Sequence, residues 1–266
     1  MKVYFVGSGP GDVELITVKG RKLIEKADSI IYAGSLINPE ILEFAKPSCK
    51  LHDSSGLTLS QICGLYVEAR ANGETVVRLH SGDPSIYGAI REQIDWLERE
   101  GIGYEVVPGV SSFTAAAAAV GRELTVPEVS QTVILTRKAG RTPAPESLAE
   151  LAQHRATMCI FLSVHMIEEV IADLKKGYPH DTPLAVVERA SWKDQKIVRG
   201  TLADIADKVK ASGIRKTAVI IVGQALGELK ARSRLYAEDF VHGYKKAGRG
   251  EAPEGEEGFD DILSDG

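Results

Sequence analysis

The chain has 266 residues, of which 44% are hydrophobic and 26% charged, and its formal net charge is -5 at pH 7. This composition is ordinary for a globular protein, and the length admits one large domain or two of medium size with a core that needs no disulfide or metal. The negative balance disfavours a protein that works mainly on nucleic acid, because phosphate contacts call for a basic surface.

The sequence predicts neither a signal segment nor a membrane span. A strand begins within the first residues, so the apolar stretch there is too short for a signal peptide, and no run approaches bilayer length. Cys49, Cys63 and Cys159 lie far apart and form no Cys-x-x-Cys pair or Cys/His cluster. This spacing favours reduced thiols and disfavours a zinc site. We therefore expect a cytoplasmic protein with no metal, membrane or nucleic-acid partner.

In the first half of the chain, short apolar strands alternate with helical segments. The predicted elements are a strand at 3–6, a helix at 17–27, a strand at 29–33, a helix at 58–71, a strand at 75–79, a helix at 85–100, a strand at 104–107 and a helix at 112–120. This β-α-β-α order predicts a parallel, doubly wound sheet.

Residues 122–130, which include Pro127, interrupt this order, and a second α/β series follows. Its predicted elements are a strand at 132–136, a helix at 146–154, a strand at 158–163, a helix at 166–176, a strand at 184–189, a helix at 202–211 and a strand at 218–222. We therefore predict two α/β domains, at residues 1–121 and 122–245. Residues 246–266 are rich in Gly, Glu and Asp, and we expect a disordered acidic tail there.

A glycine-rich turn, Gly7-Ser8-Gly9-Pro10-Gly11-Asp12, follows the first strand. Nucleotide-binding loops take this position between strand and helix, and glycine lets the backbone approach a ligand. Pro10, however, lacks an N–H that a phosphate cradle would use, and Asp12 adds a negative charge beside it. No acidic residue ends the next strand to bind a ribose. The pattern disfavours a dinucleotide site, and a purely structural turn is an equal alternative at this point.

Two later turns have a similar character. The second, Ser81-Gly82-Asp83-Pro84, ends a strand, and open parallel sheets bind ligands at that edge. Asp83 can cap the next helix or orient a cationic ligand, whereas His80 is more often a buried, hydrogen-bonded residue than an acid or base. The third, Pro108-Gly109-Val110-Ser111-Ser112, offers hydroxyls and helix-start N–H groups. Together the three turns predict one crevice built largely from backbone groups, and the lack of a Walker lysine disfavours a nucleoside triphosphate.

These turns, together with Thr182-Pro183, Glu188–Ser191 and Ala218–Gly223, resemble the tetrapyrrole methylase superfamily, the class III methyltransferases that use S-adenosylmethionine. The resemblance covers about residues 1–240. It implies an α/β fold of two domains with the cofactor cleft between them, a homodimer, and S-adenosylhomocysteine as a product.

Two further stretches, Tyr32–Ile37 and His52–Ser55, resemble the subfamily that methylates C-11 of precorrin-4 or cobalt-precorrin-4 in cobalamin biosynthesis. Uroporphyrinogen methylases usually carry an Asp-Arg-Leu type sequence where Ala33-Gly34-Ser35 stands here. The resemblance therefore favours the C-11 subfamily.

The resemblance also implies which residues contact the cofactor. They are Pro10, Ser81, Gly82, Asp83, Ile86, Ser111 and Ser112 in the first domain, with Leu162 and Ala190 in the second. An anionic tetrapyrrole substrate implies basic partners, for which the candidates are Arg21, Arg122, Arg137, Arg189 and Lys193. Candidates for contact with the macrocycle face are Tyr32 and Trp192. No motif identifies a catalytic base, and by position alone the candidates are Asp12, His80, Asp83 and Tyr87.

Other functions stay open at this stage. The nearest is a methylase of the same superfamily that acts on another ring carbon, followed by a member acting on ribosomal RNA or on the diphthine precursor. From other classes, a nicotinamide-dependent oxidoreductase and a non-catalytic nucleotide-binding regulator are disfavoured by Pro10, Asp12 and the missing ribose partner.

Overall fold

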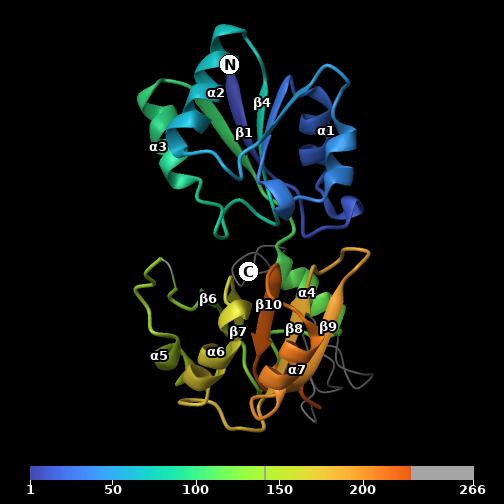
Figure 1. Cartoon of the computed structure of the whole chain (residues 1–266), viewed down its shortest axis with the longest axis vertical. Helices are drawn as coiled ribbons and strands as arrows, with labels where there is room; N and C mark the ends of the chain where they lie inside the picture. Colours follow the sequence, from blue (N-terminus) through green and yellow to red (C-terminus); the bar gives the residue numbers. More distant parts are fainter. Residues whose placement is uncertain (141, 229–266) are drawn as a thin grey trace, which may run out of the picture.

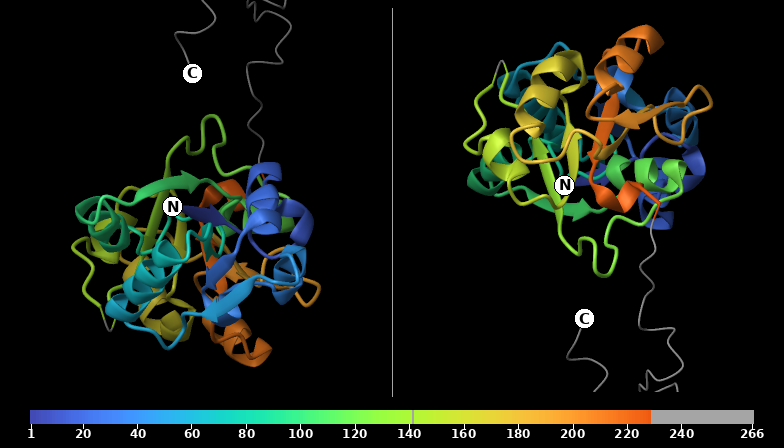
Figure 2. Two further views of the ribbon diagram at one scale, coloured as in Figure 1. Left: turned by 90° about the horizontal axis from the view of Figure 1, so that it is seen from above. Right: turned by 90° about the horizontal axis from the view of Figure 1, so that it is seen from below.

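The computed structural model describes residues 1–140 and 142–228, which form two α/β domains arranged along the long axis of the molecule (Figure 1). Viewed along that axis, one domain lies behind the other (Figure 2). The tail expected at 246–266 lies outside the described residues. None of the described helices is long and apolar enough to cross a membrane.

The first sheet has five parallel strands in the order β3-β2-β4-β1-β5. Their bounds are β1 (Lys2–Gly7), β2 (Ser29–Tyr32), β3 (Lys50–Asp53), β4 (Val76–His80) and β5 (Gly103–Val107). Helix α1 (Val18–Lys26) packs on one face through Ile24, and α2 (Leu59–Ala71) and α3 (Arg91–Arg99) pack on the other. Figure 1 shows these helices on opposite sides of the sheet, so the predicted parallel, doubly wound arrangement is confirmed.

Two local predictions in this domain were wrong. The helix expected at 85–100 begins at Arg91, because Tyr87 and Ala89 take left-handed φ angles of 56° and 50° that no helix accommodates. The strand β3 was not predicted, since three of its four residues are exposed at the sheet edge and show no apolar alternation. Short 3-10 helices lie at Val13–Leu15, Gly34–Leu36, Pro39–Phe44, Val164–Met166 and Gln224–Leu226.

The second sheet is mixed, in the order β6-β7-β10-β8-β9. Its strands are β6 (Val133–Arg137), β7 (Thr157–Phe161), β8 (Pro183–Glu188), β9 (Lys196–Thr201) and β10 (Ala218–Val222). Strands β6 and β7 are parallel, whereas β10 runs antiparallel to both of its neighbours, β7 and β8. The hairpin partner β9 was not predicted. One face is covered by α5 (Leu148–Ala152), α6 (Ile167–Leu174) and α7 (Ile205–Ser212).

The opposite face of the second sheet is covered by α4 (Ser112–Val120), which follows directly on the third glycine turn. Its alanine face packs against residues such as Ala185, Val187 and Ile221. Alanine has so little bulk that the helix can approach the strands closely. The sequence placed this helix in the first domain, whereas its packing is with the second. The chain therefore passes between the sheets at residues 108–111.

Candidate functional site

The three glycine turns meet at the carboxyl edge of the first sheet and pack backbone against backbone. The N–H of Gly82 donates to the carbonyl oxygen of Gly9 at 2.8 Å, and the N–H of Gly9 donates back to that of Gly82 at 3.3 Å. A Cβ added to Gly109 would lie 2.2 Å from the Gly82 oxygen, and one added to Gly7 would lie 2.5 Å from the same atom. No side chain fits between these turns, which explains why glycine stands at these positions.

Asp83 holds the second turn to the third. Its Oδ2 accepts a hydrogen bond from the N–H of Gly109 at 2.8 Å, and its Oδ1 accepts one from the N–H of Ser85 at 2.7 Å. Hydrogen bonds from backbone N–H groups to a carboxylate are stronger than neutral ones. The role of this side chain is therefore to fix backbone geometry, and its two oxygens are engaged in doing so.

A cavity of about 430 Å³ lies between the domains, beside the three turns. That volume is within the range of small-molecule sites. Its lining includes all nine residues expected to contact a cofactor, namely Pro10, Ser81, Gly82, Asp83, Ile86, Ser111, Ser112, Leu162 and Ala190. The structure thus brings the nine together in one place, and their binding of a cofactor stays a prediction.

The wall contributed by the second domain is built on unusual backbone conformations. Leu162, Arg189 and Thr217 line the cavity and have left-handed φ angles of 54°, 49° and 52°. Leu162 is also 61% exposed, although it is a large apolar side chain at the end of a buried strand. Left-handed non-glycine residues each cost about 1–3 kcal/mol and cluster at ligand sites. These conformations make this wall a candidate for contact with a ligand.

Sequence analysis missed the segment from Arg215 to Val219, which also lines the cavity. This segment leads into β10. Because β10 runs antiparallel to β7 and β8, the amino end of β10 lies at the edge where β7 and β8 end. The sequence predicts ligand contacts at the carboxyl ends of strands, as in a parallel sheet. Only the direction of β10 could have revealed this segment.

The charge of the cavity lining is predominantly positive. Arg189, Arg215 and Lys216 belong to the lining, and within the described part of the chain its one carboxylate is Asp83. Because that carboxylate is engaged by backbone N–H groups, the site favours an anionic ligand.

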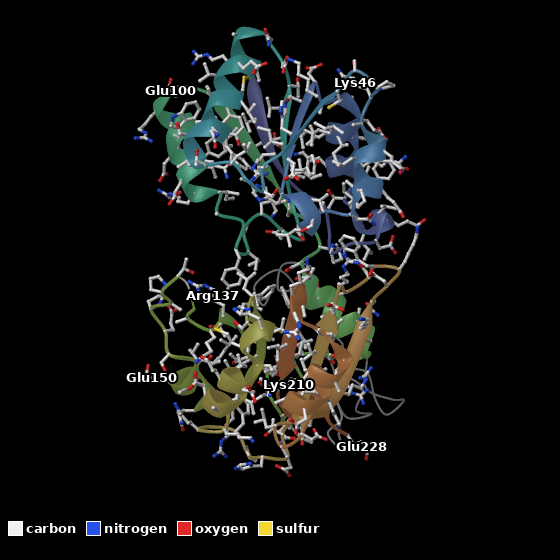
Figure 3. All side chains as sticks on the ribbon, viewed as in Figure 1. Lys46, Glu100, Arg137, Glu150, Lys210 and Glu228 are labelled. Atoms are coloured by element: carbon white, nitrogen blue, oxygen red, sulfur yellow. The ribbon has the colours of Figure 1, made fainter. Side chains whose placement is uncertain are left out.

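Four of the five basic residues expected to bind carboxylates do not line the cavity. Arg21 pairs with Glu25, and Lys193 pairs with Glu40. Arg122 donates to the Leu226 carbonyl, and Arg137, labelled in Figure 3, donates to the carbonyls of Thr142 and Pro143. Arg189 does line the cavity, although it also pairs with Asp194, and its binding of a substrate carboxylate stays a prediction. Surface loops near a site carry many charges that satisfy one another.

The two stretches resembling the C-11 subfamily lie against each other at one side of the cavity. Gly34 has a left-handed φ of 51°, and an added Cβ would lie 2.9 Å from the Cβ of Ser55 and 3.0 Å from Asp53 Oδ1. Ser54 donates to the Tyr32 carbonyl through both its N–H and its hydroxyl. Ser35 and Leu36, which follow this turn, line the cavity. Tyr32 itself does not, so its expected contact with a macrocycle finds no support.

None of the four candidate bases is a free carboxylate or imidazole facing the cavity. His80 is buried outside the lining, its Nε2 has no partner among the described residues, and burial, followed by the charge of Arg78, lowers its pKa to about 3. Asp12 caps the turn after it by accepting from Glu14 N at 2.9 Å. Burial raises the pKa of the Tyr87 phenol, which keeps it protonated at neutral pH. With Asp83 engaged, the identity of a base stays open.

The pKa of His80 predicts a loss of stability in acid. The native state keeps His80 neutral down to about pH 3, whereas the unfolded chain binds a proton below about pH 6.5. Stability from this residue is therefore complete above pH 6.5 and falls as the pH drops from 6.5 towards 3. We expect a loss of about 2 kcal/mol in unfolding free energy between pH 7 and pH 5. Denaturant unfolding of the wild type and His80→Gln at both pH values measures it, and equal pH dependence in the two would contradict the prediction.

Within the described residues, no group of three His, Cys, Asp or Glu side chains could hold a metal ion. Cys49, Cys63 and Cys159 are unpaired thiols, the last two of them buried. The chemistry that the arrangement offers is thus binding and alignment of a ligand by backbone groups, hydroxyls and cations.

Comparison with known proteins supports the family resemblance found in the sequence. The model of the tetrapyrrole (corrin/porphyrin) methylases matches residues 2–206. A cobalt-precorrin-4 C(11)-methyltransferase of Methanocaldococcus jannaschii is 56% identical over 250 residues, which cover 92% of this chain and 96% of that protein. The crystal structure of a cobalamin biosynthetic enzyme, cobalt precorrin-4 methyltransferase, superposes with a TM-score of 0.83 at 46% identity, covering 85% of this chain and 96% of the other.

A more distant solved structure contains S-adenosylhomocysteine. The uroporphyrin-III C-methyl transferase of Thermus thermophilus, complexed with S-adenosylhomocysteine, superposes with a TM-score of 0.73 at 28% identity. The match covers 85% of this chain and 99% of the Thermus chain. The likeness therefore extends over both domains.

Proposed function

This chain belongs to the family of tetrapyrrole (corrin/porphyrin) methylases, and from that premise we propose that it transfers a methyl group from S-adenosylmethionine to C-11 of precorrin-4 or cobalt-precorrin-4 in cobalamin biosynthesis. The observation that carries the proposal is the cavity, since nine residues chosen by resemblance from both domains line it together. The 56% identity to a C(11)-methyltransferase over nearly the whole length supports the choice of ring carbon.

The residues present fit S-adenosylmethionine. Ser111 and Ser112 begin a helix beside the cavity, and Leu162 offers an exposed apolar surface for the adenosine. When bound, the cofactor supplies the methyl group of its sulfonium, and the thioether that remains is an excellent leaving group. The protein's contribution is then to align the methyl and the ring carbon at near-attack distance and to exclude water.

The tetrapyrrole substrate is an anion with several carboxylates. We assign the attraction of these carboxylates to Arg189, Arg215 and Lys216, which lie in the lining beside a single engaged carboxylate. Arginine binds carboxylates in a two-point geometry, whereas lysine acts as a point charge. Methylation at a ring carbon creates a positive charge on the macrocycle, and loss of a proton from the substrate to water removes that charge.

The remaining expectations belong to the same proposal. We assign the chain to the cytoplasm, which agrees with three unpaired thiols, and to a homodimer, as the family resemblance implies. We also assign two domains, with α4 packed against the second sheet. The cleft then lies between the two sheets.

Product analysis tests the function. The purified chain is incubated with S-adenosylmethionine and either precorrin-4 or cobalt-precorrin-4, and the product is examined by mass spectrometry and NMR. We expect a single added methyl group at C-11 in at least one of the two reactions. Methylation at another carbon would replace C-11 in the proposal with that carbon. Calorimetry that detects NAD binding but no S-adenosylhomocysteine binding would overturn the methyltransferase function.

A further inference from the structure

A loop of the second domain is hydrogen-bonded to the first glycine turn across the cleft. The loop is Ser191-Trp192-Lys193, between β8 and β9, and we call it the 191–193 loop. The indole Nε1 of Trp192 donates to the carbonyl oxygen of Pro10 at 2.9 Å, and Ser191 Oγ accepts from the N–H of Asp12 at 2.9 Å. The two bonds join segments about 180 positions apart in the chain, so they fix the first turn relative to the second domain.

Gly11 lies between the two residues that are held, and its lack of a side chain makes room for the indole. A Cβ at this position would lie 2.0 Å from Trp192 Cδ1 and 2.2 Å from Nε1. The backbone of Gly11 is not in the left-handed region, so its conformation alone would admit any residue. The contact that requires glycine here is therefore the one with Trp192.

The indole is also fixed from its other side. The guanidinium of Arg189 lies 4.7 Å from the centre of the Trp192 ring and pairs with Asp194. Ser191 has a φ of 69°, and its N–H donates to Gln195 Oε1 at 2.7 Å. A strained, hydrogen-bonded loop presents its groups in one geometry rather than several. The 191–193 loop is thus rigid enough to position the turn that it holds.

The first glycine turn lines the cavity, but not every residue that is bonded to this turn lines it. Pro10, Arg189 and Trp192 line the cavity, whereas Ser191 does not. A change at Ser191 can therefore reach a ligand through Asp12 and the first turn. We infer that Ser191 and Trp192 are positioning residues, which lock the first glycine turn in the conformation that binds the cofactor. The inference rests on the cofactor binding proposed above.

Ser191→Ala tests the inference without touching the lining. It removes the acceptor of the Asp12 N–H, and a net hydrogen bond of about 1 kcal/mol corresponds to about fivefold weaker binding. We expect calorimetry to show that loss for S-adenosylhomocysteine, with the KM for S-adenosylmethionine raised and the KM for the tetrapyrrole unchanged. Unchanged affinity would overturn the inference for Ser191.

The matched control is Ser130→Ala. Ser130 Oγ likewise accepts from a backbone N–H, that of Thr157, but at the start of β7, the end away from the cavity. This variant loses the same kind of bond, together with the one that the Ser130 hydroxyl donates to the Thr132 carbonyl, and should keep wild-type affinity. Equal weakening in Ser130→Ala and Ser191→Ala would show a general effect of stability on binding and would overturn the inference.

A double-mutant cycle tests Trp192. We expect Gly11→Ala to weaken S-adenosylhomocysteine binding at least tenfold in the wild type, because its Cβ displaces the indole, and to add little in Trp192→Ala, where the obstacle is gone. Additive effects would overturn the role of Trp192. If the wild-type chain bound no S-adenosylhomocysteine, the proposed function would fail together with the inference. If it bound and the variants behaved like their controls, the inference alone would fail.

Discussion

Gly109→Ala is expected to lower methyltransferase turnover about 100-fold, because it forces apart the backbones that form the cavity edge. The new Cβ would lie 2.2 Å from the Gly82 carbonyl oxygen and 2.9 Å from the Cα of Gly7. Both neighbours are backbone atoms that cannot rotate away, so a turn has to move by about 1 Å, a displacement of the size that costs such a factor. Overpacking of this kind also lowers the unfolding free energy by about 1–3 kcal/mol.

The control is Gly103→Ala at the start of β5, the strand that leads into the turn with Gly109. Its Cβ would meet one side-chain atom, Lys2 Cγ, at 3.9 Å, an ordinary contact. We expect wild-type turnover and a thermal midpoint within a few degrees of the wild type. Steady-state kinetics and thermal unfolding of both variants check the pair. A Gly109→Ala enzyme with near-normal turnover would show that the turns can separate without harm and that their close packing is incidental.

The sequence predicts that the three glycine turns of the first domain meet, because that domain obeys a simple rule. Strands in a doubly wound sheet run parallel, so the turns after β1, β4 and β5 must emerge at one edge. Glycine and serine at those turns then indicate contact by backbone and hydroxyl groups. This rule predicts the positions of Gly82 and Ser111. It does not predict that Gly7, Gly82 and Gly109 pack closely together.

The second-domain half could not be derived in the same way. Leu162 and Ala190 came from family resemblance, since neither residue type suggests a ligand. Arg215 and Lys216 were missed because β10 runs antiparallel, and strand direction in a mixed sheet depends on tertiary packing rather than on local pattern. The cations that looked functional in sequence, such as Arg21 and Lys193, found acidic partners on the surface instead.

The segment after the second turn shows how a ligand site alters local structure. The sequence predicts a helix from residue 85, yet Tyr87 and Ala89 adopt left-handed conformations there. The Tyr87 ring reaches across the cleft to Phe161, with the ring centres 5.2 Å apart. A helix from residue 85 would not present Tyr87 in this way. The helix therefore begins only after this segment, and sequence reasoning of this kind fails most readily near a site.

Asp83→Ala is expected to weaken S-adenosylhomocysteine binding about 100-fold and to leave the chain folded. The variant leaves the N–H groups of Gly109 and Ser85 without their acceptors. Two hydrogen bonds to a carboxylate contribute about 3 kcal/mol or more together, which corresponds to that factor if the turns are ordered mainly by them.

Asp83→Asn separates this positioning role from a role for the negative charge. An amide has one carbonyl oxygen, so it can accept a hydrogen bond from the N–H of Gly109 or from that of Ser85. The remaining N–H then faces the NH2 group of the amide, which is a donor and cannot accept. If Asp83 works by holding the turns, Asn should fall between wild type and Ala in affinity. If it works by attracting the sulfonium, Asn should behave like Ala towards S-adenosylmethionine while binding of the uncharged-sulfur product S-adenosylhomocysteine is nearly normal. Calorimetry with both ligands decides between the two, and the geometry, in which each carboxylate oxygen already accepts a backbone N–H, predicts the first.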